Sequence, residues 1–222
     1  VKRTRNRPLA ARALSIWVGL GVAIASFTCA WILSLYLNPL TFWLCVAAVP
    51  IIVLYPLAKR IFLIPQLVLA IAWGFAVLIS WSAVSCGSTP AATPCLGAPT
   101  WFLWGATVLW TLGFDTVYAM SDRDDDRRLG VNSSALFFGK YVSHVVGMFF
   151  AGTVILLAAV GSSMALNGFY WLTLAIATGL WIWQYYRLCQ KTIPPVAYGQ
   201  LFRQNVWIGF ILLGGMIAGN WQ

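Results

Sequence analysis

All the acidic side chains of this chain lie within twelve positions, 115–126, and glutamate is absent. Asp115, Asp122 and Asp126 follow one another at helical steps of three or four residues, by way of Tyr118, so on one helix they share a face. Mg²⁺ is usually held in proteins by one or two carboxylates together with the phosphates of a substrate. The spacing therefore predicts a magnesium–phosphate site.

A solvated charged turn is the alternative reading of the same window, because arginines are interleaved with the acids at 123, 127 and 128. Asp124 and Asp125 point away from the predicted face and fit either reading equally well. The confinement of every carboxylate to one place favours function for the other three, since acids beside a membrane are costly to keep there.

Composition decides what surrounds this window. Hydrophobic residues make up 61% of the chain and charged residues 9%, and the mean hydropathy is +0.82. Soluble domains carry about 25% charged residues, so this chain lacks the polar surface that water requires. We expect an integral membrane protein with a single domain over residues 1–222.

The apolar runs predict an all-α, polytopic transmembrane bundle. Each run is long enough to cross about 30 Å of hydrocarbon as a helix. Seven spans are expected, at approximately 13–36, 40–57, 66–84, 100–120, 143–162, 167–186 and 205–221.

The formal charge of +9 comes from 14 Lys and Arg residues gathered in four short segments. These are Lys2 to Arg12, Lys59-Arg60, Arg123 to Lys140 and Arg187 to Arg203. With seven spans all four fall on one side, which the positive-inside rule makes cytoplasmic. This distribution argues against a nucleic-acid-binding face and places the acidic window at the cytoplasmic surface.

Cysteine and histidine offer little chemistry. Cys86 and Cys95 share the longest loop on the opposite side, where a disulfide and two free thiols are equally consistent with the sequence. His144 is the only histidine and has no cysteine pair near it, which excludes an ordinary zinc site and favours a packing or capping role.

Residues 115–139 resemble the second aspartate-rich motif of the UbiA-type membrane prenyltransferases, in particular the 4-hydroxybenzoate polyprenyltransferases. The stretch reads Asp-Thr-Val-Tyr-Ala-Met-Ser-Asp-Arg-Asp-Asp-Asp-Arg-Arg-Leu-Gly-Val-Asn-Ser-Ser-Ala-Leu-Phe-Phe-Gly. Residues 3–9 resemble the basic stretch that follows the family's first aspartate motif. Residues 55–60, Tyr-Pro-Leu-Ala-Lys-Arg, resemble the Tyr-Pro then Lys-Arg element of the next cytoplasmic loop, and residues 202–209 are also similar.

The resemblance implies a Mg²⁺-dependent transferase of nine helices, of which about seven are present here. Family members bind a polyprenyl diphosphate through Mg²⁺ between two aspartate motifs, and an aromatic ring attacks the resulting allylic cation. Asp122 and Asp126 are then metal-linked, with Asp115 as ligand, outer-shell partner or phenol-activating group. Substrate-binding roles follow for Arg3, Arg7, Tyr55, Lys59 and Tyr118.

This chain departs from the family pattern at its start, because the first aspartate motif precedes the stretch matched by residues 3–9 and no second acidic cluster exists. We therefore expect an N-terminally truncated chain that is weakly active or inactive alone. A non-catalytic remnant stays open as an alternative.

The expected partners are a polyprenyl diphosphate, 4-hydroxybenzoate and the lipid bilayer, in the inner membrane of a bacterium and in the synthesis of a ubiquinone or plastoquinone precursor. Other acceptors stay open, namely homogentisate, dihydroxynaphthoate, haem and chlorophyllide. So does a cation-coupled transporter, although only Asp115 lies at membrane depth and no inverted repeat is visible. Nothing in the sequence indicates an oligomeric state.

Overall fold

The computed structural model describes residues 7–87, 95–190 and 192–221, and within these ranges all regular structure is helical. The predicted spans correspond to the seven long helices of the described chain. These are α1 (Ile16–Ser34), α2 (Pro39–Ile61), α3 (Pro65–Ser85), α4 (Ala98–Ser121), α7 (Val142–Ser163), α8 (Gly168–Leu188) and α9 (Pro195–Gly219). Three short elements follow α4, namely α5 (Arg123–Leu129), α6 (Ser134–Phe137) and the 3₁₀ turn η1 (Gly139–Tyr141).

The helices begin where the sequence supplies caps. Ser15 and Asn38 accept hydrogen bonds from the backbone N–H groups of Val18 and Thr41, at 3.3 and 3.0 Å. Prolines occupy the first turns of α2, α3, α4 and α9, where a missing N–H costs least. Helix boundaries therefore follow local chemistry, and the main difference from the expected spans is α9, which begins at Pro195 and not at residue 205.

Within the described residues, five helical segments are long and apolar enough to cross a membrane. They comprise α1, α2, α3, α9 and the segment Gly139–Ser163. The remaining long helices, α4 and α8, are less apolar. For α4 the reason is its place in the bundle, where it packs against α3, α7 and α9, because a helix surrounded by protein need not present an apolar surface to lipid.

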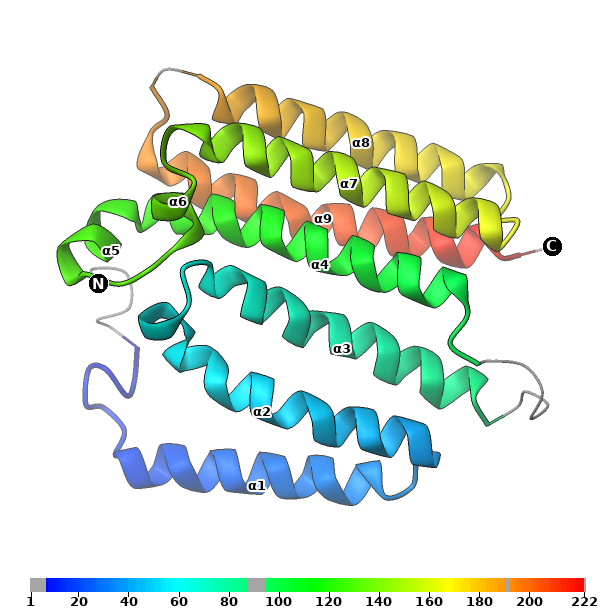
Figure 1. Ribbon diagram of the computed structural model, residues 1–222, viewed down its shortest axis with the longest axis horizontal. Coiled ribbons are helices and arrows are strands. Elements are labelled where there is room, and N and C mark those ends of the chain that lie inside the picture. The colour runs from blue at the N-terminus through cyan, green and yellow to red at the C-terminus, as the bar shows by residue number, and fades with distance from the viewer. Residues whose placement is uncertain (1–6, 88–94, 191, 222) are drawn as a thin grey trace.

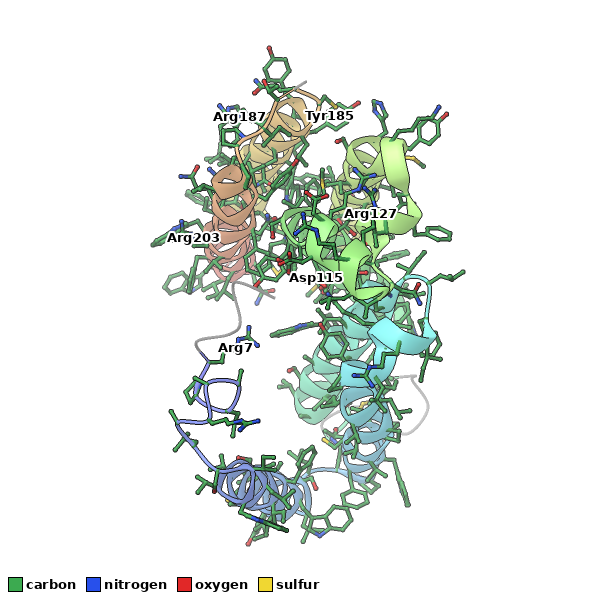
Figure 2. The ribbon with its side chains drawn as sticks, turned by 90° about the vertical axis from the view of Figure 1, so that its left-hand side faces the viewer. Arg7, Asp115, Arg127, Tyr185, Arg187 and Arg203 are labelled. Carbon is green, nitrogen blue, oxygen red and sulfur yellow. A yellow bond between two sulfur atoms is a disulfide. The ribbon has the colours of Figure 1, made fainter. Side chains whose placement is uncertain are left out.

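The long helices form an open arc rather than a closed ring (Figures 1 and 2). Neighbours along the chain pack in order from α1 to α4, then α4 packs on α7, α7 on α8, and α8 on α9. The main core lies among α4, α7, α8 and α9, around Phe150, Trp181 and Ile208. In contrast, the most apolar window of α1 is entirely unburied.

The two ends of the bundle differ in chemistry. In Figure 1 the chain before α1, from residue 7 on, the α2–α3 turn, α5 and the start of α9 all lie at the left-hand end, so the described parts of the four basic segments share one side as expected. Cys86 and Cys95 lie at the other end and form a disulfide with their Cα atoms 5.1 Å apart.

Candidate active site

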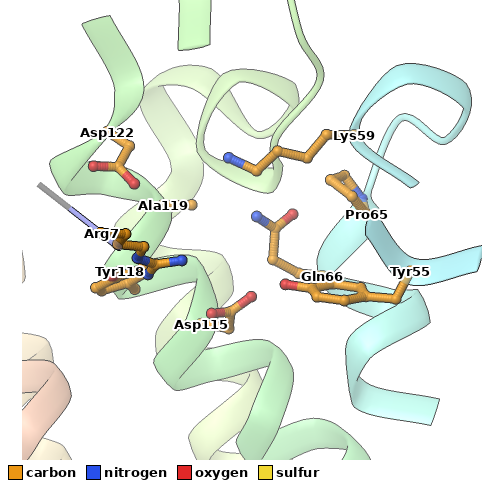
Figure 3. A pocket seen from close by; sticks show the side chains of 9 residues that line it. All are labelled: Arg7, Tyr55, Lys59, Pro65, Gln66, Asp115, Tyr118, Ala119 and Asp122. Atoms are coloured by element: carbon orange, nitrogen blue, oxygen red, sulfur yellow. The ribbon is translucent and has the colours of Figure 1, made fainter. Parts of the chain in front are cut away.

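A cavity of about 240 Å³ opens at the charged end of the bundle, between α4 and the α2–α3 corner (Figure 3). Its lining brings together residues far apart in the sequence. They are Arg7, Tyr55, Lys59, Pro65, Gln66, Asp115, Tyr118, Ala119 and Asp122. Six of these were expected as site residues from the sequence: Arg7, Tyr55, Lys59, Asp115, Tyr118 and Asp122.

The last turns of α4 supply the acidic wall of the cavity. Asp115, Tyr118, Ala119 and Asp122 recur at helical spacing and therefore point to the same side. Figure 3 shows the Asp115 carboxyl group directed toward Tyr55 and Gln66, whereas the Asp122 carboxyl group is directed toward Arg7, which lies beside the Tyr118 ring. Asp122 is only 9% exposed, so water competes weakly for its carboxylate.

Two helices supply the opposite wall. Tyr55 and Lys59 are four residues apart on α2 and so lie on one face near its end. Gln66 lies in the first turn of α3, directly after Pro65, and is 4% exposed. The α2–α3 turn thus directs a phenol, an ammonium and an amide toward the two aspartates.

The expectation that a single helix carries Asp115, Asp122 and Asp126 is wrong. Helix α4 ends at Ser121, and Asp122 has a non-helical backbone (φ −100°, ψ 2°) before α5 begins at Arg123. Asp126 is not among the residues that line the cavity, and its side chain is 1% exposed.

Asp126 instead forms an ion pair with Lys59, whose Nζ lies 3.0 Å from Oδ1 and 3.3 Å from Oδ2. Lys59 is therefore both a lining residue and a cross-link between α2 and α5. A metal-linked role for Asp126 stays a prediction and would require this ion pair to rearrange or to be shared.

The segment after α5 is held against the α2–α3 corner by hydrogen bonds from its backbone N–H groups. The N–H of Asn132 donates to the carbonyl of Lys59 at 2.8 Å, and the N–H of Ser134 donates to Gln66 Oε1 at 2.9 Å. The hydroxyl oxygens of Ser134 and Thr116 are 2.9 Å apart. These contacts hold residues 126–134 against α2, α3 and α4, and so bound the cavity on a third side.

Gln66 was missed from the sequence. A signal was present, since it is an amide in the first turn of an otherwise apolar span, on the same side of the membrane as the acidic window. Arg3 lies outside the described residues. Arg7 extends toward Asp115 across the inside of the helical arc (Figure 2).

His144 lies outside this cavity, and its Nδ1 is 2.9 Å from the hydroxyl of Tyr185 on α8. His144 is exposed, so the expected packing or capping role stays a prediction. Among the described residues no three His, Cys, Asp or Glu side chains converge to hold a metal. The oxygen donors of the cavity are the carboxylates of Asp115 and Asp122, which suit Mg²⁺ shared with a phosphorylated ligand.

The sequence profile of the UbiA prenyltransferase family matches residues 1–206. This chain belongs to the UbiA prenyltransferase family. A 4-hydroxybenzoate solanesyltransferase from Synechocystis sp. is 63% identical over 219 residues, which are 99% of this chain and 72% of that protein. A 4-hydroxybenzoate octaprenyltransferase from Ralstonia nicotianae is 40% identical, over 98% of this chain and 72% of the relative.

Solved structures agree with the UbiA assignment. The apo structure of a UbiA homologue from Aeropyrum pernix K1 superimposes with a TM-score of 0.83 at 25% identity, over 97% of this chain and 77% of that one. A structure of digeranylgeranylglyceryl phosphate synthase gives a TM-score of 0.71 at 19% identity, over 99% and 76%. The second likeness shows the fold alone.

Proposed function

We propose that the protein transfers a polyprenyl group from a polyprenyl diphosphate to the ring of 4-hydroxybenzoate, giving a precursor of ubiquinone or plastoquinone. One observation carries the proposal: acidic, basic and phenolic side chains from three separate segments line a single cavity in a member of the UbiA family. The names of the relatives supply the acceptor. Family membership also favours a transferase over a cation-coupled transporter.

Mg²⁺ is the cofactor we propose, with Asp122 as a residue that holds it and Asp115 as ligand or outer-shell partner. When bound, the ion offsets the negative charge that builds on a departing diphosphate. The cavity fits this use because it offers carboxylate oxygens without a complete ligand set, leaving coordination positions for phosphate oxygens. The same donor set would suit neither zinc nor a soft metal.

The cavity residues divide by charge into two tasks. The cations Arg7 and Lys59 bind the diphosphate or the carboxylate of the aromatic acid, as preorganised charges do for developing anions. Asp115 lies deepest among the acids and accepts the proton of the phenol hydroxyl as the ring becomes the nucleophile. Tyr55 and Tyr118 border the aromatic substrate.

Bond changes in this reaction balance without an oxidant or reductant. The bond between the allylic carbon and the diphosphate oxygen breaks, and its electron pair leaves with the diphosphate. The ring carbon beside the hydroxyl forms the new carbon–carbon bond and then loses its proton to a base, which restores aromaticity.

We also propose that the charged end of the bundle faces the cytoplasm of a bacterial inner membrane. The basic segments gather at that end, as the positive-inside rule requires. The Cys86–Cys95 disulfide lies at the opposite end, where an oxidising compartment permits it.

An assay of the complete gene product in membranes tests the function, with 4-hydroxybenzoate, Mg²⁺ and a set of prenyl diphosphates that begins with solanesyl diphosphate. Asp122→Ala should lower turnover by at least about a hundredfold, the usual cost of removing a group that stabilises the transition state. Asp124→Ala is the matched control, because Asp124 is exposed on α5 and outside the cavity lining. Equal turnover in the two variants would refute the site.

A further inference from the structure

Gln66 is the one strongly polar cavity residue that the mechanism above leaves without a task. Its exposed fraction is only 4%, yet it lines the cavity from the first turn of α3. A buried amide is retained in a membrane bundle only where hydrogen bonds satisfy it.

One half of the amide is accounted for. Oε1 accepts a hydrogen bond from the backbone N–H of Ser134 at 2.9 Å. A backbone N–H can only donate, so the amide atom that faces it must be the oxygen. The carbonyl side of Gln66 is therefore assigned by its partner, which settles the orientation of the amide plane.

The other half faces the cavity. With Oε1 held by Ser134, Nε2 is the group that Gln66 presents to the space between Lys59 and Asp115 (Figure 3). No hydrogen bond among the described residues involves Nε2, and Nε2 is not one of the polar atoms that are shut off from solvent without a partner. Two N–H donors of Gln66 thus face a cavity in which Lys59, a neighbouring donor, already contacts Asp126.

We propose that Gln66 is a substrate-binding residue whose Nε2 donates a hydrogen bond to an anionic oxygen of the bound substrates. This rests on the proposed function, since the ligands considered are its two substrates. The carboxylate of the aromatic acid and the oxygens of the diphosphate present the same acceptor chemistry, and separate measurements distinguish them. Arg7 and Lys59 attract the anionic substrates by charge. The amide of Gln66 instead orients the bound oxygen, because the hydrogen bond from Ser134 fixes the amide plane.

A purely structural role is the competing explanation, in which Gln66 only anchors Ser134. Gln66→Glu separates the two. A glutamate has the same shape and still offers an oxygen to the Ser134 N–H, but it replaces the cavity-facing donor by a negatively charged acceptor. The structural role predicts normal kinetics for this variant, and the binding role predicts a defect.

The experiment measures KM for each substrate and kcat in the complete gene product, in membranes. We expect Q66E to raise KM at least tenfold for one substrate, the loss that a hydrogen bond to a charged group predicts. A rise for 4-hydroxybenzoate assigns Nε2 to the carboxylate, and a rise for the diphosphate assigns it to the phosphate. Gln190→Glu, an exposed glutamine at the end of α8, controls for the added charge.

Wild-type KM values for both substrates in Q66E would overturn the proposal and leave Gln66 as an anchor. If Q66E does not accumulate, Q66M replaces it, and unchanged KM values there overturn the proposal equally. Calorimetry with inorganic pyrophosphate and with 4-hydroxybenzoate separates this test from the proposed function. Weaker binding of either probe to Q66E supports the role of Gln66 even if the wild-type protein transfers no prenyl group, and equal binding of both contradicts it.

Discussion

Nζ of Lys59 lies 3.0 Å from Oδ1 of Asp126, across 67 positions of sequence, and joins the end of α2 to α5. The two partners differ in exposure, since the lysine side chain is 40% exposed and the aspartate 1%. The backbone of Asn132 bonds to the carbonyl of the same lysine. Lys59 therefore determines where the chain after the acidic window lies.

Breaking this pair from the lysine side should destabilise the protein. Lys59→Met leaves a buried carboxylate without its cation, which costs several kcal/mol in a fully buried pair and about 2 kcal/mol here, since the lysine is partly solvated. Thermal unfolding in detergent of Lys59→Met, Asp126→Asn and the double variant measures the coupling. The double variant should unfold at a higher temperature than Lys59→Met; strictly additive losses would contradict the ion pair.

Adjacent glycines on α9 should respond oppositely to alanine. A Cβ at Gly215 would clash with Thr173 on α8, whereas at Gly214 nothing lies within 4 Å. Gly215→Ala should cost about 1–3 kcal/mol through overpacking, and Gly214→Ala should be neutral or slightly stabilising because alanine favours helix. Unfolding temperatures of the pair compare them directly, and similar values would mean that α8 and α9 pack less closely than described.

Replacing Asn205 should destabilise the protein because its side chain on α9 forms hydrogen bonds with side chains of both α4 and α8. Its Oδ1 accepts from the indole N–H groups of Trp110 and Trp181, at 2.8 and 3.1 Å, and its Nδ2 donates to Gln184 Oε1 at 3.2 Å. Asn205→Leu leaves these groups unpaired, at a cost of about 1–2 kcal/mol for hydrogen bonds between membrane helices. Gln204→Leu, which loses one bond of 3.3 Å, is the control and should cost less.

Removing the disulfide should lower stability but spare catalysis. The Cys86→Ser/Cys95→Ser variant opens a short loop, worth about 2–3 kcal/mol in the loop-entropy view. The disulfide follows the end of α3 that is remote from the cavity, so the KM values should not change. A changed KM would show that the two ends are coupled.

Much of the candidate site could be read from residue types and helical periodicity. Asp115 and Tyr118 lie on α4 and Asp122 directly follows its last residue, so their spacing alone placed them on one side of the helix. Tyr55 and Lys59 share a helix in the same way. That these two stretches meet was an inference from family resemblance and from the positive-inside rule, and periodicity alone does not supply it.

The errors occur where helical periodicity stops. Asp126 follows the break between α4 and α5 at Asp122, so the spacing of one continuous helix no longer gives the direction of its side chain. Gln66 was overlooked because an amide in an apolar span carries no motif; its meaning depends on the Ser134 N–H, 68 residues later.

The amino-acid sequence by itself determined the membrane location, the positions of the long helices and the end of the bundle that carries the charge, because each follows from local hydropathy and charge. Only the tertiary structure decided which polar groups meet. Ion pairs and hydrogen bonds at the α2–α3 corner join residues that are 67 and 68 positions apart. They form only when separate helices pack together, and local sequence patterns do not predict that packing.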